Sequence, residues 1–474
     1  MNKLKPLPEE WSGLLNNEQK EAIENINGPL LIIAGAGSGK TRVLTYRYAH
    51  LIKTYGINFE NVLAITFTNK AANEMKDRIS DLLNLELSPK WISTFHSLCV
   101  KMLRIHGHLI GFNNNFTIYD QSDSTKLVRN CMRDSDIDTK QYSPKRIQAH
   151  ISSLKNQRIL PGEAVEFAQS FFDVKVAEIY SSYQKKLMLA NSMDFDDLLI
   201  KAVELLETSD KSLNYWSSKF QYIMIDEYQD TNMVQYRLVE LLASKHKNIC
   251  VVGDSDQSIY AFRGADIRNI EEFESDFKNA KVISLEKNYR SSQKILDIAN
   301  AVISNNPRKK DKKLWTDNDE GLDVNLVEFN SERDESRWIA EQINKLLEDK
   351  AFTEIAIFYR TNNQSRLFEE ELRKLSLSYK VVGNVRFYDR KEIKDILAYL
   401  RLIINSNDEE SLKSISSIAQ LVDEMREDEP CIVSDVYPKI TDVQRKFHNN
   451  IIHDSFRNSS IIAQCTICTK DECR

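Results

Sequence analysis

Short apolar runs recur along the chain, each followed by small or polar residues and then by a segment with helical spacing. The clearest runs are Leu30–Ala34, Val62–Thr66, Tyr222–Ile225 and Ile249–Val252. Runs that are apolar at nearly every position are typical of strands buried on both faces, as in a parallel sheet. Their alternation with helical segments predicts an α/β domain.

The pattern changes between about residues 99 and 190, where charged segments with helical spacing dominate and strand signals are few. This stretch predicts a helical domain inserted into the α/β domain. The run 191–199 returns the chain to the sheet and contains three acids, Asp194, Asp196 and Asp197. Such acids could hold a metal ion, but acids in the first turn of a helix also cap its N-terminus, and we favour the cap.

A second α/β pattern follows residue 320. Val324–Phe329, Glu354–Tyr359 and Tyr379–Val382 have the apolar character of strands, and helical spacing is found near Asp334–Glu348 and near Gln364–Leu375. We therefore expect a β-α-β-α-β unit that begins a second sheet without closing it.

Composition and charge exclude few classes of protein. The 474 residues are 42% hydrophobic and 28% charged, which fits a globular chain of several domains. No run approaches the ~20 apolar residues that cross a bilayer, and the N-terminus lacks the apolar core of a signal peptide. Seven irregularly spaced cysteines suit a reducing compartment, so we expect a cytoplasmic protein without a membrane partner. The net charge of −6 predicts no general attraction to nucleic acid, although a local basic groove would suffice.

The first apolar run leads into a glycine-rich turn and then into a helix. The turn reads Ala34, Gly35, Ala36, Gly37, Ser38, Gly39, Lys40 and Thr41. Glycines allow successive backbone N–H groups to converge on phosphate oxygens, and the N-terminus of the helix adds a partial positive charge. In such a loop Lys40 reaches the β- and γ-phosphates and Thr41 places its hydroxyl on Mg²⁺.

The run at Tyr222–Ile225 ends in two acids, Asp226 and Glu227. After a phosphate-binding loop, this pair predicts the second half of a nucleoside triphosphatase site. Asp226 would hold the water shell of Mg²⁺, and Glu227 would accept the proton of the attacking water.

Several other turns carry groups suited to the same site. Gln257 follows a central strand, where it could sense the γ-phosphate. Gln19 could present its amide to adenine, but a solvated helix residue is the simpler interpretation. Tyr289 could stack on adenine, and Arg290 could stabilise charge on the transferred phosphoryl group. We interpret the basic stretch 308–313 as a solvated loop.

Another turn mixes aromatic and basic residues. Tyr260, Phe262 and Arg263 suit stacking on bases and contact with phosphates. Packing of these aromatics between two domains is the alternative.

Together these segments resemble a superfamily 1 DNA helicase of the UvrD/PcrA/Rep type. The resemblance covers about residues 10–413 and rests on the order and number of the matching segments, which are Ala34–Thr41, Ala64–Ala72, Thr94–Ser97, Asp194–Leu199, Ile225–Thr231, Val252–Ala265, Asn288–Ser291, Tyr359–Asn362 and Phe387–Asp395. It implies two RecA-like P-loop domains, the second incomplete here, with helical insertion domains.

The resemblance implies the following domain limits: a first RecA-like domain at 1–93 and 200–286, a helical insertion at 94–199, part of a second RecA-like domain at 287–382, the start of a second insertion at 383–413, and a tail without resemblance at 414–474.

The resemblance also implies roles for individual residues. ATP would be held at the adenine by Gln19, Arg42 and Tyr289, and at the phosphates and Mg²⁺ by Lys40, Thr41 and Asp226. Glu227 would be the base, and Gln257 and Arg290 would contact the γ-phosphate. The polar residues that would contact single-stranded DNA are Thr94, His96, Arg263, Arg360 and Asn362. The aromatic residues that would stack on its bases are Phe67, Phe195, Tyr260 and Phe262. The family usually has Trp at position 262, so stacking at this Phe has less area.

The resemblance implies ATP-driven movement from 3′ to 5′ on single-stranded DNA and unwinding at single-strand/duplex junctions. The implied context is DNA repair or replication, and proteins of those processes are possible partners.

Two motifs of the family are missing from the sequence. One has a Thr-x-His-x-x-Lys-Gly-like core, and the other supplies a further Arg to the γ-phosphate. Residues after about 414 do not resemble the family, as a shifted or early-ending reading frame would produce. Cys465, Cys468 and Cys473 with His448 or His453 form only a partial zinc pattern, and an unstructured tail fits them better. The alternative function is therefore a truncated ATP- and DNA-binding protein that cannot couple hydrolysis to unwinding.

Overall fold

The computed structural model describes residues 5–86, 88–306, 312–347, 351, 354–382 and 391–415. The chain forms two compact units, residues 1–386 and 387–474. The partial zinc pattern predicted in the tail lies outside the described residues. Among the helices of the described part, none is both long and apolar enough to cross a bilayer.

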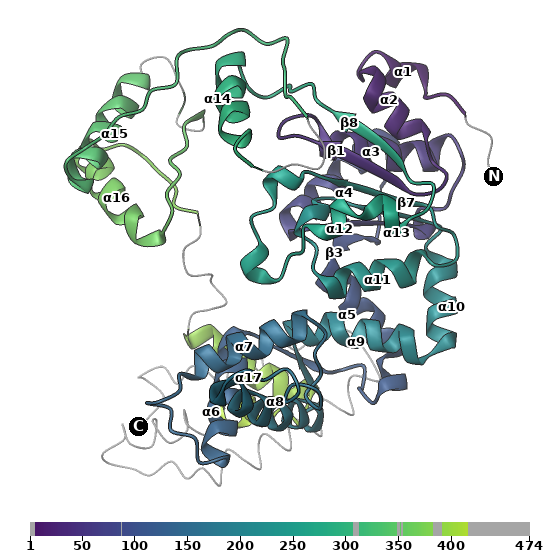
Figure 1. Cartoon of the computed structure of the whole chain (residues 1–474), viewed down its shortest axis with the longest axis vertical. Helices are drawn as coiled ribbons and strands as arrows, with labels where there is room; N and C mark the ends of the chain where they lie inside the picture. Colours follow the sequence, from purple (N-terminus) through teal and green to yellow (C-terminus); the bar gives the residue numbers. More distant parts are fainter. Residues whose placement is uncertain are drawn as a thin grey trace, which may run out of the picture. The chain divides into compact units, whose positions relative to one another are not determined.

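A six-stranded parallel sheet forms the centre of the first unit (Figure 1). Its strands, in spatial order, are β3 (Ile92–Thr94), β2 (Val62–Thr66), β6 (Tyr222–Ile225), β7 (Ile249–Gly253), β1 (Leu30–Ala34) and β8 (Lys281–Leu285). The strands predicted from the apolar runs are confirmed. Because β6, β7 and β1 are neighbours and parallel, the turns at their carboxyl ends meet at one edge of the sheet.

Alternate residues of the strands face two separate cores. Leu31 and Ile223 pack in one core with the helices on one face of the sheet, whereas Leu30 and Met224 pack in the other core with the helices on the opposite face. β1, β2, β6 and β7 are therefore buried on both faces, which is why their sequences are apolar without alternation, whereas the edge strand β8 is partly exposed.

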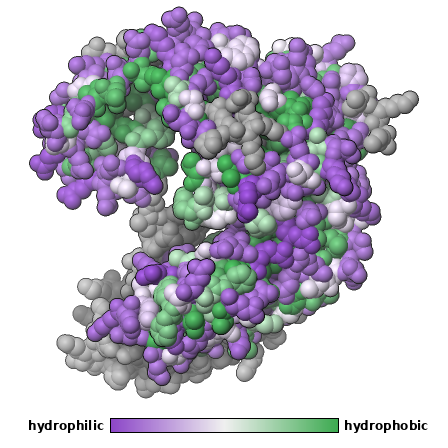
Figure 2. Space-filling model, in the orientation of Figure 1, coloured by the Kyte–Doolittle hydropathy of each residue, from purple (hydrophilic) through white to green (hydrophobic). Residues whose placement is uncertain are grey.

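The helices that cover this sheet precede its first strand (α1 and α2) or lie between its strands in the sequence. They are α1 (Glu9–Ser12), α2 (Asn17–Glu24), α3 (Lys40–Lys53), α4 (Asn69–Leu83), α5 (Phe95–His106), α9 (Phe195–Thr208), α10 (Asp210–Lys219), α11 (Met233–Ala243), α12 (Arg268–Glu271) and α13 (Phe273–Asp276). Figure 2 shows hydrophilic residues over most of the face in view, with apolar residues in smaller patches.

The predicted helical stretch has a core of its own. Its helices are α6 (Gln121–Asp134), α7 (Pro144–Asn156) and α8 (Phe171–Leu189). Val128, Ile151 and Tyr180 are buried together between them. The stretch leaves and returns through a short parallel pair, β4 (Thr117–Tyr119) and β5 (Ser192–Asp194).

The strands predicted after residue 320 are wrong for the described residues. Helices α14 (Gln293–Ile303), α15 (Glu332–Leu346) and α16 (Ser365–Lys374) are present, but Val324–Phe329, Glu354–Tyr359 and Tyr379–Val382 have no strand pairing. Ile355 and Ile357 pack on the core of α15 and α16, whereas Leu326 is fully exposed (100%). The alternating apolar residues Ile355 and Ile357 thus pack against the two helices. They do not form a strand, because a strand also needs a neighbouring backbone with which to pair.

In the second unit the structure describes helix α17 (Lys391–Ile404) and, after a short turn, helical residues 409–415. Ala398, Leu402 and Ile415 form a small buried cluster there.

Candidate functional site

The glycine-rich turn joins β1 to α3, as the sequence predicts. Gly37 and Gly39 have φ values of +70° and +91°, a conformation that disfavours any side chain. Gly39 caps α3, so Lys40 and Thr41 are the first residues of that helix. The turn therefore directs backbone N–H groups and a helix N-terminus toward one point, which is the arrangement that binds phosphate.

Lys40 and Glu227 meet across the carboxyl edge of the sheet. The Lys40 Nζ lies 2.8 Å from the Glu227 Oε2, although the two residues are 187 positions apart. Gln229 Nε2 donates to the same oxygen at 2.9 Å. Glu227 has a φ of +51°, so its backbone is held in the left-handed region at the end of β6.

Asp226 lies beside this pair and is buried. Its Oδ1 accepts a hydrogen bond from the Glu227 N–H at 3.0 Å. Burial and then the neighbouring Glu227 raise the pKa of Asp226 to about 6, and Lys40 opposes the shift only in part. Burial likewise raises the pKa of Asp230 to about 6, and its Oδ1 is buried without a hydrogen-bond partner. Carboxylates that are costly to ionise without a cation are suited to holding one.

Gln257 lies at the end of β7, next to the same edge. Its Nε2 donates to Asp254 Oδ2 at 2.6 Å, and Asp254 in turn receives the Lys312 ammonium. Lys312 is only 8% exposed, so interpreting stretch 308–313 as a solvated loop is wrong at this residue; residues 307–311 lie outside the described part.

Gln19 is buried against the phosphate loop rather than solvated. Its Nε2 donates to the Ser38 carbonyl at 3.1 Å, and its Oε1 accepts from the Asn16 N–H at 3.2 Å. The solvated interpretation is therefore wrong. Arg42 is exposed on the first turn of α3, where its role stays a prediction.

Tyr289 and Arg290 also lie beside the loop. The Tyr289 N–H donates to the Gly37 carbonyl at 2.9 Å, and both side chains are exposed. Asn288 anchors this turn, because its Nδ2 donates to the Ala36 carbonyl at 2.7 Å while its Oδ1 accepts two backbone N–H groups. Sequence reasoning missed Asn288 and Gln229 as parts of the site. Their signal is an amide side chain three or four residues after the end of a strand.

Aromatic side chains gather after β2 and β7. The ring centroids of Phe67 and Tyr260 are 5.0 Å apart, and those of Tyr260 and Phe262 are 5.9 Å apart. Phe262 is 78% exposed, so it presents a ring face to solvent. These three residues are called the aromatic cluster below.

A second aromatic contact joins α5 and α9. His96 and Phe195 meet edge to face at 5.9 Å, and burial lowers the pKa of His96. Thr94 caps α5 by accepting from the Ser97 N–H at 3.3 Å. Thr94 is therefore the N-cap of α5, and a contact between Thr94 and DNA stays a prediction.

The remaining predicted DNA contacts lie on two turns. Arg360 and Asn362 lie on the exposed turn before α16. Arg263 lies in the same turn as Tyr260, but its side chain lies outside the described part.

Comparison with known proteins assigns these features to a family. The model of the UvrD/REP helicase N-terminal domain matches residues 15–278, and that of the UvrD-like helicase C-terminal domain matches residues 283–448. The chain belongs to the UvrD/REP helicase family. The second match agrees with the expected pair of RecA-like domains and extends beyond the segment at 413 where the motif resemblance ends.

Proteins named ATP-dependent DNA helicase PcrA, from Staphylococcus epidermidis and Staphylococcus aureus, are 49% identical to the chain over 405 residues. The matched part is 85% of this chain and 56% of each relative. The chain thus spans little more than half the length of these relatives.

Two of the three acids at the end of β5 and the start of α9 form a helix cap, as predicted, and Asp196 lies in the first turn of that helix. Asp194 and Asp197 make a capping box at the start of α9. Both also pair with the buried ammonium of Lys155, at 2.7 and 2.8 Å. In the part of the chain that the structure describes, no cluster of three or more His, Cys, Asp or Glu residues could hold a metal ion, so the alternative of a metal site here is not supported.

Proposed function

We propose that this chain binds ATP with Mg²⁺ at the carboxyl edge of the six-stranded sheet and hydrolyses the nucleotide to move along single-stranded DNA. The observation that carries the proposal is the 2.8 Å contact between Lys40 and Glu227, which joins the phosphate loop to the predicted base. Membership of the UvrD/REP helicase family supports it, because the relatives with 49% identity are named ATP-dependent DNA helicases.

In the site without nucleotide, Lys40 and Glu227 neutralise one another. The triphosphate competes for the ammonium of Lys40, because phosphate oxygens form charge-assisted hydrogen bonds with it. Glu227 is then free to accept a proton from the attacking water. The ion pair therefore keeps the base engaged until ATP arrives.

Thr41 and Asp226 are the residues that would hold Mg²⁺. A bound Mg²⁺ would neutralise charge developing on the phosphates. The raised pKa of Asp226 fits this role, since a cation nearby favours the ionised carboxylate. Gln257 would face the γ-phosphate, and Arg290 would add positive charge there.

The adenine end would be bounded by Gln19, Arg42 and Tyr289. Gln19 is already oriented by its hydrogen bonds to Asn16 and Ser38, so it would lose little freedom on binding. The exposed ring of Tyr289 provides a stacking face.

The aromatic cluster would bind bases of single-stranded DNA. Stacking on aromatic rings tolerates any base, which suits a protein that moves along a strand. Phe195 with His96 would form a neighbouring pocket, and Thr94, Arg263, Arg360 and Asn362 would contact the backbone. By family resemblance, movement runs from 3′ to 5′, the substrate is a single-strand/duplex junction, and the context is DNA repair or replication.

A duplex with a single-stranded tail tests this proposal. The chain with ATP and Mg²⁺ is expected to release the short strand from a 3′-tailed duplex and not from a 5′-tailed one. Release from the 5′-tailed duplex alone would contradict the direction, and release by a Lys40→Ala variant would contradict the proposed site.

A second candidate function is binding of ATP and DNA without unwinding. It is favoured by the segments 324–329, 354–359 and 379–382, which have no strand pairing, so the described residues after 320 form no second sheet. Nucleotide-dependent DNA binding without strand release would support this candidate instead.

A further inference from the structure

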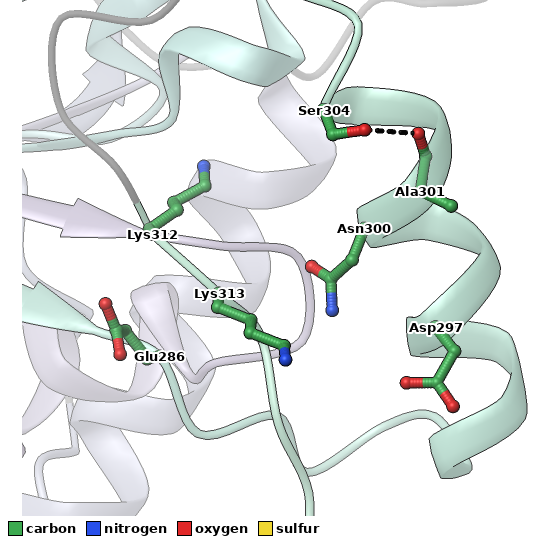
Figure 3. A pocket seen from close by; sticks show the side chains of 7 residues that line it. All are labelled: Glu286, Asp297, Asn300, Ala301, Ser304, Lys312 and Lys313. Atoms are coloured by element: carbon green, nitrogen blue, oxygen red, sulfur yellow. Dashed lines mark hydrogen bonds between the residues drawn. The ribbon is translucent and has the colours of Figure 1, made fainter.

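Lys312 occupies a place in the nucleotide site that neither the motifs nor the comparisons assign. It begins a segment that lies along the turn after β8. Trp315 pairs with this turn: its N–H donates to the Glu286 carbonyl at 3.3 Å, and its carbonyl accepts from the Asn288 N–H at 2.8 Å. Asn300 of α14 donates to the Leu314 carbonyl at 3.0 Å. The segment is therefore held from two sides; Figure 3 shows Lys312 and Lys313 on it, with Asn300 of α14 nearby.

This segment touches the phosphate loop. A Cβ atom added at Gly35 would lie 2.3 Å from Leu314 Cδ2, so the Leu314 side chain covers the loop at its first glycine. Burial, and then the charge of Lys40, lower the pKa of Lys312 to about 8. Two lysines thus approach the same site, one from α3 and one from the segment after α14.

Lys312 neutralises two acids of the turn after β7. Its Nζ pairs with Asp254 and lies 3.1 Å from Asp256 Oδ2. Asp254 is buried, and its other oxygen accepts the amide of Gln257 at 2.6 Å. Without a cation, two carboxylates would stand beside the position proposed for the γ-phosphate, where they would repel the triphosphate.

We infer that Lys312 is a positioning residue of the nucleotide site, which neutralises Asp254 and Asp256 and holds Asp254 so that Gln257 faces the γ-phosphate. The inference rests on the proposed ATP site. Loss of Lys312 should therefore weaken the binding of ATP more than the binding of ADP, because Asp254 and Gln257 lie at the γ-phosphate end of the proposed site.

Lys313 provides a matched control. It carries the same charge one position along the chain and is exposed. In Figure 3 its side chain points in a different direction from that of Lys312, and it lines a cavity of about 640 Å³ beside Asn300.

The test is titration of the 474-residue chain with fluorescent methylanthraniloyl derivatives of ATP and ADP in Mg²⁺. Lys312→Ala is expected to weaken the affinity for ATP about tenfold and the affinity for ADP less than about threefold. Lys313→Ala should change neither beyond about twofold, and Lys312→Arg should retain most of the ATP affinity. In the Lys312→Ala background, Asp256→Asn should restore several-fold of the lost ATP affinity, because it removes one uncompensated carboxylate.

The outcomes separate the inference from the proposed function. If the wild-type chain binds ATP and Lys40→Ala abolishes binding, but Lys312→Ala behaves like Lys313→Ala, the inference is wrong and the proposed site stands. If the wild-type chain binds no ATP, or if the Lys40→Ala variant binds ATP as tightly as the wild type does, the proposed function is wrong. Should Lys312→Ala fail to fold, Lys312→Met keeps the aliphatic stem, and equal weakening of ATP and ADP in it would overturn the inference.

Discussion

At the scale of single residues, the site depends on charges that neutralise one another before any ligand arrives. Lys40 contacts Glu227 at 2.8 Å, and Lys312 contacts Asp254 and Asp256. Among the described residues no lysine or arginine forms an ion pair with Asp226, and burial raises its pKa to about 6. The site is thus prepared for a ligand that supplies both a divalent cation and phosphate oxygens.

Replacing the proposed base tests the assignment of Glu227. Glu227→Gln is expected to lower the rate of ATP hydrolysis by about 10²–10⁴-fold, because the amide cannot accept the proton of water. ATP affinity should stay the same or rise, since Lys40 loses its competing partner. Steady-state hydrolysis and nucleotide titration measure the two effects. A variant with unchanged turnover would show that another group is the base.

His50 gives a prediction for stability against pH. Burial, and then the charge of Arg47, lower the pKa of His50 to about 4, and its Nε2 is buried without a hydrogen-bond partner. Between pH 6.5 and 4 the unfolded chain takes up a proton that the folded chain does not, so stability falls as pH falls through this window. His50→Phe should reduce that loss by on the order of 2 kcal/mol in the free energy of unfolding.

The control is Leu109→Phe, which places the same side chain at an exposed position and removes no imidazole. Leu109→Phe should leave the pH dependence of unfolding as it is in the wild type. Parallel curves for the wild type and His50→Phe would contradict the neutral, buried state of His50.

At the scale of elements, the end of α7 fixes the turn between β5 and α9. Lys155, the penultimate residue of α7, is fully buried between Asp194 and Asp197. Burial alone would lower the pKa of Lys155, but the two carboxylates raise it above its ordinary value. Asn156 adds hydrogen bonds to Asp196 at 3.1 Å and from Asn232 at 2.6 Å. The turn that presents Phe195 is therefore held by the helical insertion.

Removing the buried ammonium is expected to destabilise this turn strongly. Lys155→Met should lower the free energy of unfolding by about 3–5 kcal/mol, because two buried carboxylates lose their counter-charge. The control is Lys201→Met, which removes a partly exposed pair with Glu204 and should cost about 0–1 kcal/mol. Equal losses in chemical denaturation would contradict the account of Lys155.

The aromatic cluster gives a prediction on DNA. Phe262→Ala is expected to weaken binding of single-stranded DNA by about 1–3 kcal/mol, the usual contribution of one stacked base. Phe262→Trp should retain or strengthen binding, since it enlarges the stacking face. Phe171→Ala, at an exposed Phe (69%) of α8, is the control and should leave affinity unchanged. Fluorescence anisotropy with a labelled oligonucleotide measures all three.

Elements also show what the sequence could predict. Strands β1, β2, β6 and β7 are apolar without alternation because helices cover both faces of the sheet, and this signal is local. The glycine-rich loop and the acids after β6 were predictable for the same reason. The strands expected after residue 320 were not, because Ile355 and Ile357 face α15 and α16 while their backbone is unpaired. Backbone pairing depends on a partner that a local pattern does not contain.

Contacts between residues that lie far apart in the chain also could not be predicted from the sequence. Lys312 is one of several lysines in a basic stretch, and nothing in that stretch marks it as the one that pairs with Asp254. Gln19 likewise has an ordinary helical context, yet it is buried against Ser38. Both depend on how segments far apart in the chain fold against the phosphate loop.

At the scale of the whole molecule, a chain of the UvrD/REP helicase family has a complete sheet for the first domain and a site built on its carboxyl edge. Both family domain models match it, and the matched part covers 56% of the length of the relatives. We propose that ATP hydrolysis at this site responds to DNA bound at the aromatic cluster.

The most direct measurement is the rate of ATP hydrolysis by the 474-residue chain with and without single-stranded DNA, beside Lys40→Ala and Glu227→Gln. The account predicts that DNA raises the wild-type rate at least several-fold and leaves both variants at background. A wild-type rate that stays at the level of the two variants with DNA present would contradict it.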